Sequence, residues 1–282
     1  MSPTSTSSDR DSRADSSLGR TSSGVGLCAI HQPNLFPRLS TLAKIYAADC
    51  WIVLDDVQFA RRDYQHRARL APLGRPQQHQ WLTLPTHLPH GRSTTIREAR
   101  LVEPARARRR LHRTLAHAYG SSRYWLDLEI RLDAVAVAMD DTDRTAAVTE
   151  ASTRLLLDLL GWTGSILRSS QFTVRADRSL RLADLVSAVQ ADGYLCGPGG
   201  MKYLRLEEFA EQRTPVIPFT TPTTEGIWQD ARRLSALYAL MTFGPDAVRR
   251  EVTRIADAHA LPASARPDAL AAISVRDEGV PA

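Results

Sequence analysis

Two short apolar segments, each followed at once by polar side chains, constrain the fold of this chain more than any other feature of its sequence. They cover residues 27–30 and 51–54, and each has the length of a buried strand. Polar residues stand directly behind them: His31, Gln32 and Asn34 after the first, and Asp55, Asp56 and Gln58 after the second. Between the segments, apolar residues recur at helical spacing over 39–46. The pattern predicts a strand–helix–strand unit.

Such a unit has parallel strands, and the carboxyl ends of parallel strands meet at one edge of the sheet. In open α/β sheets, ligands bind beyond that edge. We therefore expect one cleft to receive an imidazole, two amides and a pair of carboxylates. The predicted fold is an α/β, Rossmann-like three-layer domain with a parallel sheet and a helical insertion at about residues 104–160.

The rest of the chain supplies the elements that such a domain needs. Further strands are predicted at 80–85, 165–167, 193–196 and 216–219, and helices at 180–189, 234–241 and 247–256. We expect residues 61–70 to form a loop or short helix over the cleft and residues 86–93 to form a loop suited to a lid. The glycine-rich segment 197–200 is predicted to form an anion-binding turn.

Composition limits the domain organisation and the location. Residues 1–24 are rich in Ser, Thr, Arg and Asp and lack the apolar core of a signal peptide, so we expect a disordered tail, an α/β domain over 25–260 and a second tail over 261–282. No apolar run approaches the roughly 18–20 residues of a membrane span, which favours a cytoplasmic protein that does not contact membranes. Cys28, Cys50 and Cys196 are widely spaced and are expected to be buried free thiols.

The basic residues are unusual in kind. The chain has 34 arginines but only two lysines, Lys44 and Lys202, and its formal net charge is +5. GC-rich coding produces such a skew, so the charge itself carries little functional information. A lysine that is kept in so arginine-rich a chain indicates a position where a primary amine does something that a guanidinium cannot. We find no nucleic-acid motif and no arginine stripe interleaved with aromatic residues, so nucleic acid is not an expected partner.

Three residues are the catalytic candidates. A neutral imidazole at His31 can donate to a phosphate oxygen or act as a general acid or base. Asp55 or Asp56 can bind Mg²⁺, orient a substrate hydroxyl or act as a base, while the other caps a helix or pairs with an arginine. The alternative for each is a structural role at a strand end.

The candidates for substrate binding combine amides, cations and aromatic rings. They are Gln32, Asn34, Gln58, Arg62, Tyr64, Lys202 and Tyr203. Amides orient a substrate through paired donors and acceptors, and Arg62 and Lys202 are suited to neutralising a phosphate or carboxylate. His87 and His90 lack further ligands nearby, so no metal site is predicted.

Several ordered motifs together resemble the WbqC-like protein family, over about residues 27–248. They are HQPNLFP at 31–37, LDDVQF at 54–59, WLTLP at 81–85, YLCGPGGMKY at 194–203, and the segment from Leu234 and Ser235 to Phe243 and Gly244. The resemblance implies small-molecule biosynthesis, either of surface polysaccharides or of specialised metabolites such as antibiotics. The chain departs from the usual family pattern at Arg38 and Ser40, at the pair His66–Arg67 and at Cys196, which concerns the substrate more than the fold.

A looser similarity links the first strand–helix–strand unit to the nucleotidyltransferase-like HUP enzymes, in which a histidine motif binds nucleotide phosphates. Only His31 and Asn34 map onto that motif. The similarity implies a nucleotide with Mg²⁺ as the cofactor, although the sequence itself leaves the cofactor unknown.

Three functions remain open from the sequence. The first is a group transferase or ligase that passes an acyl, aminoacyl or nucleotidyl unit to an amine or hydroxyl of a sugar-like or specialised-metabolite substrate. The second is a non-catalytic accessory or binding protein that associates with a partner biosynthetic enzyme. The third is an RNA-linked role, such as the use of an aminoacyl-tRNA donor.

Overall fold

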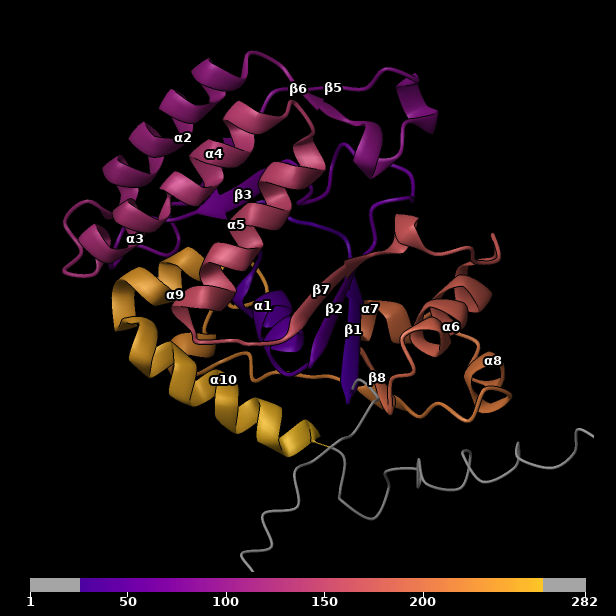
Figure 1. Ribbon diagram of the computed structural model, residues 1–282. Helices are drawn as coiled ribbons and strands as arrows, with labels where there is room; N and C mark the ends of the chain where they lie inside the picture. The colour runs from indigo at the N-terminus through magenta and orange to yellow at the C-terminus, as the bar shows by residue number, and fades with distance from the viewer. Residues whose placement is uncertain (1–25, 261–282) are drawn as a thin grey trace, which may run out of the picture.

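A parallel sheet of five strands forms the centre of the molecule (Figure 1). The computed structural model describes residues 26–260, and both predicted tails, 1–24 and 261–282, lie outside the described residues. The strands are β1 (Leu27–His31), β2 (Cys50–Val53), β7 (Ser165–Arg168), β8 (Gly193–Cys196) and β9 (Val216–Pro218). Their spatial order is β7-β2-β1-β8-β9, and every neighbouring pair is parallel. The α/β prediction is confirmed.

The strand order reverses direction once, between β1 and β8. From β1 the chain proceeds outward to β2 and then β7, and it returns to the other side of β1 to form β8 and β9. Cys28 is therefore paired with Cys50 of β2 on one side and with Tyr194 of β8 on the other. The gap at the carboxyl ends of β1 and β8 is the topological switch point, where open α/β sheets bind ligands.

Alternating side chains of the strands pack into two apolar layers, as expected for a sheet covered on both faces. Leu27 and Ala29 of β1 join one layer, and Cys28 and Ile30 join the other. Helices α1 (Leu39–Tyr46), α5 (Thr145–Leu159), α9 (Ala236–Phe243) and α10 (Pro245–His259) cover the first face. Helices α6 (Arg178–Ala188) and α8 (Glu207–Ala210) cover the second. Figure 1 shows the sheet between these two groups of helices.

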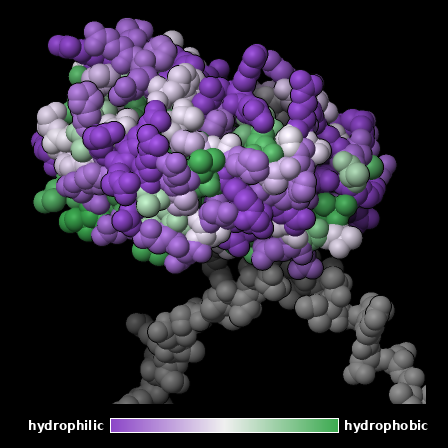
Figure 2. Space-filling model, turned by 90° about the horizontal axis from the view of Figure 1, so that it is seen from above, coloured by the Kyte–Doolittle hydropathy of each residue, from purple (hydrophilic) through white to green (hydrophobic). Residues whose placement is uncertain are grey.

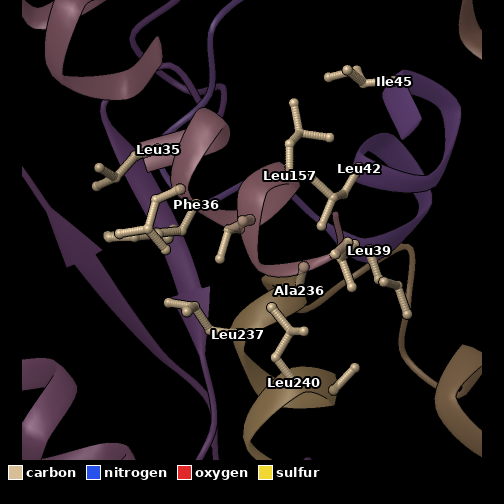
Figure 3. Close-up of a cluster of buried hydrophobic side chains, with 14 of the residues drawn as sticks. Leu35, Phe36, Leu39, Leu42, Ile45, Leu157, Ala236, Leu237 and Leu240 are labelled. Carbon is tan, nitrogen blue, oxygen red and sulfur yellow. The ribbon is translucent and has the colours of Figure 1, made fainter. Parts of the chain in front are cut away.

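The larger apolar layer fixes α1 against the helices around it. Figure 3 shows Leu42 of α1 beside Leu157 of α5, with Leu39 and Ile45 of α1 and Leu237 of α9 in the same cluster. All five side chains are at most 1% exposed. Burial of a leucine-sized side chain contributes about 1.5–3 kcal/mol, so this contact holds α1 firmly beside the switch point.

The predicted helical region at 104–160 is present and consists of four helices. Helices α2 (Pro104–Tyr119), α3 (Trp125–Arg131) and α4 (Asp133–Asp141) stand away from the sheet, at the upper left of Figure 1, whereas α5 packs against it. Among the described residues, no helix combines the length and apolar character needed to cross a bilayer. The three cysteines are free and buried, as predicted.

The segment before the helical region differs from the prediction. Residues 67–70, expected in a loop or short helix, form the strand β3 (Arg67–Leu70), because alternate residues of this segment are buried. It pairs with β4 (Gln80–Thr83) as a separate antiparallel hairpin outside the main sheet. The predicted lid loop contains β5 (Thr86–His87), which pairs with β6 (Arg100–Leu101).

Short helical turns complete the structure. The predicted glycine-rich turn opens α7 (Pro198–Met201). Single 3₁₀ turns are present at η1 (Gly91–Ser93), η2 (Ile96–Glu98), η3 (Ser169–Gln171) and η4 (Gly226–Trp228). Turn η3 follows β7 directly in the chain, and η2 is hydrogen-bonded to the segment just after β2. Both turns therefore lie at the carboxyl edge of the sheet.

Candidate functional site

A cavity of about 400 Å³ lies at the switch point, and we call it the switch-point cleft. Strands β1 and β8, helix α1, the start of α7 and the segment after β9 surround it. Its lining residues are Ile30, His31, Arg38, Ser40, Thr41, Lys44, Tyr194, Cys196, Gly197, Pro198, Gly199, Gly200, Phe219, Thr220, Thr221 and Arg232. A volume of a few hundred Å³ is typical of small-ligand sites.

The charge of the cleft has one sign. Its lining includes Arg38, Lys44 and Arg232, and no Asp or Glu occurs among the described residues that line it. Lys44 of α1 and His31 of β1 line the same cavity. A ligand that fits this cleft electrostatically is an anion, because no acidic side chain in the lining compensates the positive charge.

Lys44 is the most unusual residue of the cleft, because its amine is buried. The residue is 6% exposed, and Nζ donates a hydrogen bond to the backbone oxygen of Ile30 at 3.0 Å. Burial lowers the pKa of Lys44 to about 8, against a smaller opposing effect of the thiols of Cys196 and Cys28. An ammonium group has three N–H donors, so Lys44 keeps donors for a ligand.

His31 is neutral in the folded protein. Burial, together with the positive charges of Lys44 and Arg38, holds the pKa of His31 well below its ordinary value. Its Nε2 lies 3.2 Å from Nδ2 of Asn34, and because an amide NH₂ group only donates, the neutral ring accepts at Nε2 and carries its proton on Nδ1. Asn34 is itself fixed, since its backbone oxygen accepts from Thr153 Oγ1 at 3.1 Å.

Two polar atoms of the cleft lining have no hydrogen-bond partner anywhere in the described part of the chain. They are Nε of Arg38 and Oγ1 of Thr221, and both atoms are buried. Buried polar groups are nearly always hydrogen-bonded, so an unpaired donor in a cavity wall is a mark of a ligand position. Two such atoms in one small cavity support a binding site there.

Glycine lets α7 approach the floor of the cleft. A Cβ atom at Gly200 would lie 2.6 Å from Sγ of Cys196, closer than any real contact of this kind. The short helix therefore packs directly over the end of β8, and Gly197 to Gly200 form one wall of the cavity.

The acidic doublet occupies a different position from the one predicted. Asp55 follows β2 on the same edge of the sheet as His31, but it lines a second cavity of about 480 Å³, together with Val53, Glu150 and Arg168 among others. Asp55 is 4% exposed, and its carboxylate accepts from Ser170 N at 3.0 Å and from Ser170 Oγ at 2.9 Å. The structure therefore does not bring Asp55 and His31 into one cavity.

Asp56 is also engaged by protein groups. Its carboxylate lies 2.8 Å from Nη1 of Arg181 on α6 and accepts from Ser169 Oγ at 2.5 Å. Ser169 additionally contacts Asp55, at 3.1 Å. The doublet thus ties the end of β2 to η3 and α6.

The predicted amide residues mostly organise the loops around the cleft. Gln32 Oε1 accepts from the buried Gln65 at 2.9 Å, and Gln58 is exposed and donates to the backbone oxygen of Arg92 at 2.5 Å. Asn34 contacts the cleft through its hydrogen bond with His31.

The predicted cationic and aromatic residues lie outside the cleft lining. Tyr64 stacks beneath Arg38, with 4.5 Å between the guanidinium carbon and the ring centre. Arg62 is exposed, as are Lys202 and Tyr203 just beyond α7.

Sequence reasoning missed several cleft residues, above all Lys44, Arg38 and Thr221. The scarcity of lysine did single out Lys44, but the residue stands among buried apolar positions of α1, where helical periodicity gives no reason to expect a ligand contact. Thr221 follows β9 in a segment without a motif.

Comparison with known families now identifies the chain. A model of the WbqC-like protein family matches residues 32–250. The chain belongs to this family. An uncharacterised protein of Mycobacterium tuberculosis, Rv1507c, is 24% identical over 183 residues, which cover 65% of this chain and 77% of that protein. No solved structure matches the chain.

The departures from the usual family pattern noted from the sequence divide between the cleft and its surroundings, since His66 and Arg67 do not line the cleft. Arg38, Ser40 and Cys196 all line the switch-point cleft.

Proposed function

We propose that this protein is a biosynthetic group-transfer enzyme whose anionic substrate binds in the switch-point cleft. The observation that carries the proposal is the buried, cationic lining: Lys44 and Arg38 face a cavity without a carboxylate, beside the neutral imidazole of His31. The acyl, aminoacyl or nucleotidyl unit passes to an amine or hydroxyl of a sugar-like or specialised-metabolite acceptor.

Each cleft residue has a defined part in this proposal. Lys44 and Arg38 bind the phosphate or carboxylate of the substrate and stabilise the negative charge that grows on the leaving group. His31 donates through Nδ1–H to a substrate oxygen, because an imidazole with so low a pKa is a weak base but remains a good donor. Thr221 supplies a hydroxyl to the same ligand.

Thermal-shift and calorimetric titration with pyrophosphate, ATP, CTP and a nucleotide sugar test the binding step. We expect saturable binding by at least one of these anions, and a loss of affinity of at least about tenfold in Lys44→Met, since a charge-assisted hydrogen bond contributes about 1.5–3 kcal/mol. Arg109→Gln, an exposed site on α2 outside the cleft, is the matched control and should bind as the wild type does. Equal affinity in wild type and Lys44→Met would refute the assignment of the cleft.

A transfer assay separates an enzyme from an accessory protein. The isolated protein is incubated with the bound anion and with candidate acceptors, which are small molecules made by the enzymes that neighbouring genes encode. Reaction products are followed by mass spectrometry. Product formation that depends on His31 supports the enzyme. Binding without turnover, together with stable association with a neighbouring enzyme, favours the accessory role.

A further inference from the structure

A row of stacked arginine and aromatic side chains leads away from the switch-point cleft. We call Arg38, Tyr64, Trp81, Arg67 and Arg69 the arginine–aromatic strip. Arg38 lies over the ring of Tyr64 at 4.5 Å, the rings of Tyr64 and Trp81 are 5.5 Å apart, and Arg67 and Arg69 lie over Trp81 at 4.2 and 4.7 Å. The hairpin β3–β4 carries most of the strip, because Arg69 and Trp81 are cross-strand partners.

The positive charge of the strip is not neutralised by the protein. Within residues 26–260, none of its three arginines forms an ion pair, whereas other surface arginines do, as in Arg175–Asp184 and Arg205–Asp177. The carboxylate of Asp63 is near in sequence, but it accepts from the backbone N–H of Tyr64 at 2.8 Å. The Nε atoms of Arg38 and Arg69 are buried and have no partner in this part of the chain. Arg67 donates to the backbone oxygen of Asp63 at 3.1 Å and to that of Arg62, which orients its guanidinium group without neutralising the charge. The strip therefore offers a polyanion three positive charges without carboxylate partners among the described residues.

The strip is continuous with the cleft through Arg38, which belongs to both. The backbone confirms the connection: Ser235 N donates to Arg69 O at 2.9 Å, and Arg38 forms an isolated bridge with Ser235. A ligand that occupies both features is longer than the cleft alone can hold, and its outer part is anionic. Seen from above, the surface is mostly hydrophilic, and its hydrophobic residues form small separate groups (Figure 2).

We propose that the arginine–aromatic strip binds single-stranded RNA and leads the end of that RNA into the switch-point cleft. Single-stranded nucleic acids are held by a positively charged track with aromatic side chains, and bases also stack on guanidinium planes. A mononucleotide is too short to occupy both the cleft and the strip, and an acidic protein surface has no bases to pack against guanidinium groups and aromatic rings. Repeated phosphates and bases match both components of the strip.

The inference rests on the proposed function where it names the donor: an acyl or aminoacyl unit esterified to the terminal ribose of the RNA. In the transfer, the nitrogen of the acceptor amine forms a bond to the ester carbonyl carbon. The carbon–oxygen bond to ribose breaks, and the ribose oxygen receives the proton that the amine loses. No oxidant, reductant or further reactant is needed.

Fluorescence anisotropy with a labelled single-stranded RNA of about 12 nucleotides tests the strip. We expect Arg67→Gln/Arg69→Gln to raise Kd at least about tenfold and to flatten its salt dependence. The control Arg109→Gln/Arg113→Gln removes the same charge from exposed, unpaired positions of α2 and should change Kd less than about twofold. Arg67→Lys/Arg69→Lys, which keeps the charge but not the planar stacking groups, should fall between the two.

Two results would overturn the proposal. One is an equal loss of RNA binding in Arg67→Gln/Arg69→Gln and in Arg109→Gln/Arg113→Gln, which would show that binding responds to net charge alone. The other is equally tight, Arg67- and Arg69-dependent binding of polygalacturonate, an acidic polysaccharide without bases. Pyrophosphate binding in the strip variant, with melting temperature, reports separately on the cleft and on folding. If that binding persists while RNA binding fails in the wild type, the proposed function stands and this inference falls.

Discussion

The amine of Lys44, on α1, donates to the backbone oxygen of Ile30, on β1, at 3.0 Å, and so places a cation at the carboxyl edge of the sheet. The hydrogen bond satisfies one donor and leaves the charge without a carboxylate partner in the described part of the chain. Such a group is costly to bury, and it is the arrangement expected where a ligand supplies the counter-charge.

Replacement of Lys44 by Met should stabilise the protein at neutral pH and weaken anion binding at least about tenfold. The pKa of Lys44 in the folded protein, about 8, lies below its ordinary value of 10.5, so between these pH values the unfolded chain holds more protons than the folded one. The wild-type free energy of unfolding therefore rises with pH across this window, and below it the full cost of about 3 kcal/mol applies. Urea denaturation at pH 7 and pH 10 should show the advantage of Lys44→Met shrinking as the pH rises.

A constant difference between the two proteins at both pH values would contradict the burial of a charged amine. If Lys202→Met, and not Lys44→Met, removes anion binding, the lysine predicted from the glycine-rich motif is the relevant one, and the assignment to the cleft is wrong.

His31 should make the protein sensitive to acid. Its pKa in the folded state lies well below 6.5, whereas in the unfolded chain it titrates close to that value. As the pH falls through 6.5 the unfolded chain takes up a proton that the folded state refuses, so the free energy of unfolding drops by up to about 1.4 kcal/mol per pH unit. His31→Gln lacks this contribution, and its stability relative to wild type should rise between pH 7 and pH 5.

The same comparison has an internal check. Burial also lowers the pKa of His66, to about 4, but that residue is present in both proteins and its contribution cancels. If the difference in free energy of unfolding between wild type and His31→Gln does not change with pH, His31 takes up a proton as readily in the folded protein as in the unfolded chain. In the transfer assay, His31→Ala should abolish turnover while the protein remains folded.

Asp55 distinguishes a structural from a catalytic role for the acidic doublet. Its buried carboxylate accepts from Ser170 N and Ser170 Oγ, so Asp55→Ala leaves these donors unpaired and should cost about 2–3 kcal/mol of stability. Pyrophosphate affinity of the folded variant should stay within about twofold of wild type, because the carboxylate does not line the cleft. A variant of wild-type stability that has lost turnover would instead support catalysis by Asp55.

The layout of the sheet was predictable because its signals are local. Short apolar runs ending in polar residues identified β1, β2 and β8, and the parallel arrangement followed from the strand–helix–strand pattern. The division of His31 and Asp55 between two cavities was not predictable, since it depends on Ser169 and Ser170, more than a hundred residues from Asp55 in sequence. Local patterns hold no information on such long-range hydrogen bonds.

The arginine–aromatic strip was missed for a related reason. Its members come from the start of α1, from the segment before β3, and from both strands of the hairpin β3–β4. Residues 61–70 were expected as a loop or short helix, which gave no cross-strand pairing between Arg69 and Trp81. An antiparallel pair places such residues about 4.5–5.5 Å apart, and only the observed register shows which ones meet.

Thr221 separates binding from stability most cleanly. Its hydroxyl is buried in the cleft wall and has no hydrogen-bond partner within residues 26–260, so the folded protein without ligand has already lost the hydration of this group. Thr221→Val keeps the shape and removes the unpaired oxygen, and we expect the free energy of unfolding to stay level or to rise by about 1 kcal/mol. If the hydroxyl serves the anion, the affinity for pyrophosphate should fall about fivefold to tenfold in calorimetric titration. Thr242→Val, the same substitution at a residue outside the cleft lining, should leave the affinity for pyrophosphate unchanged. Unchanged affinity in both variants would remove Thr221 from the binding site.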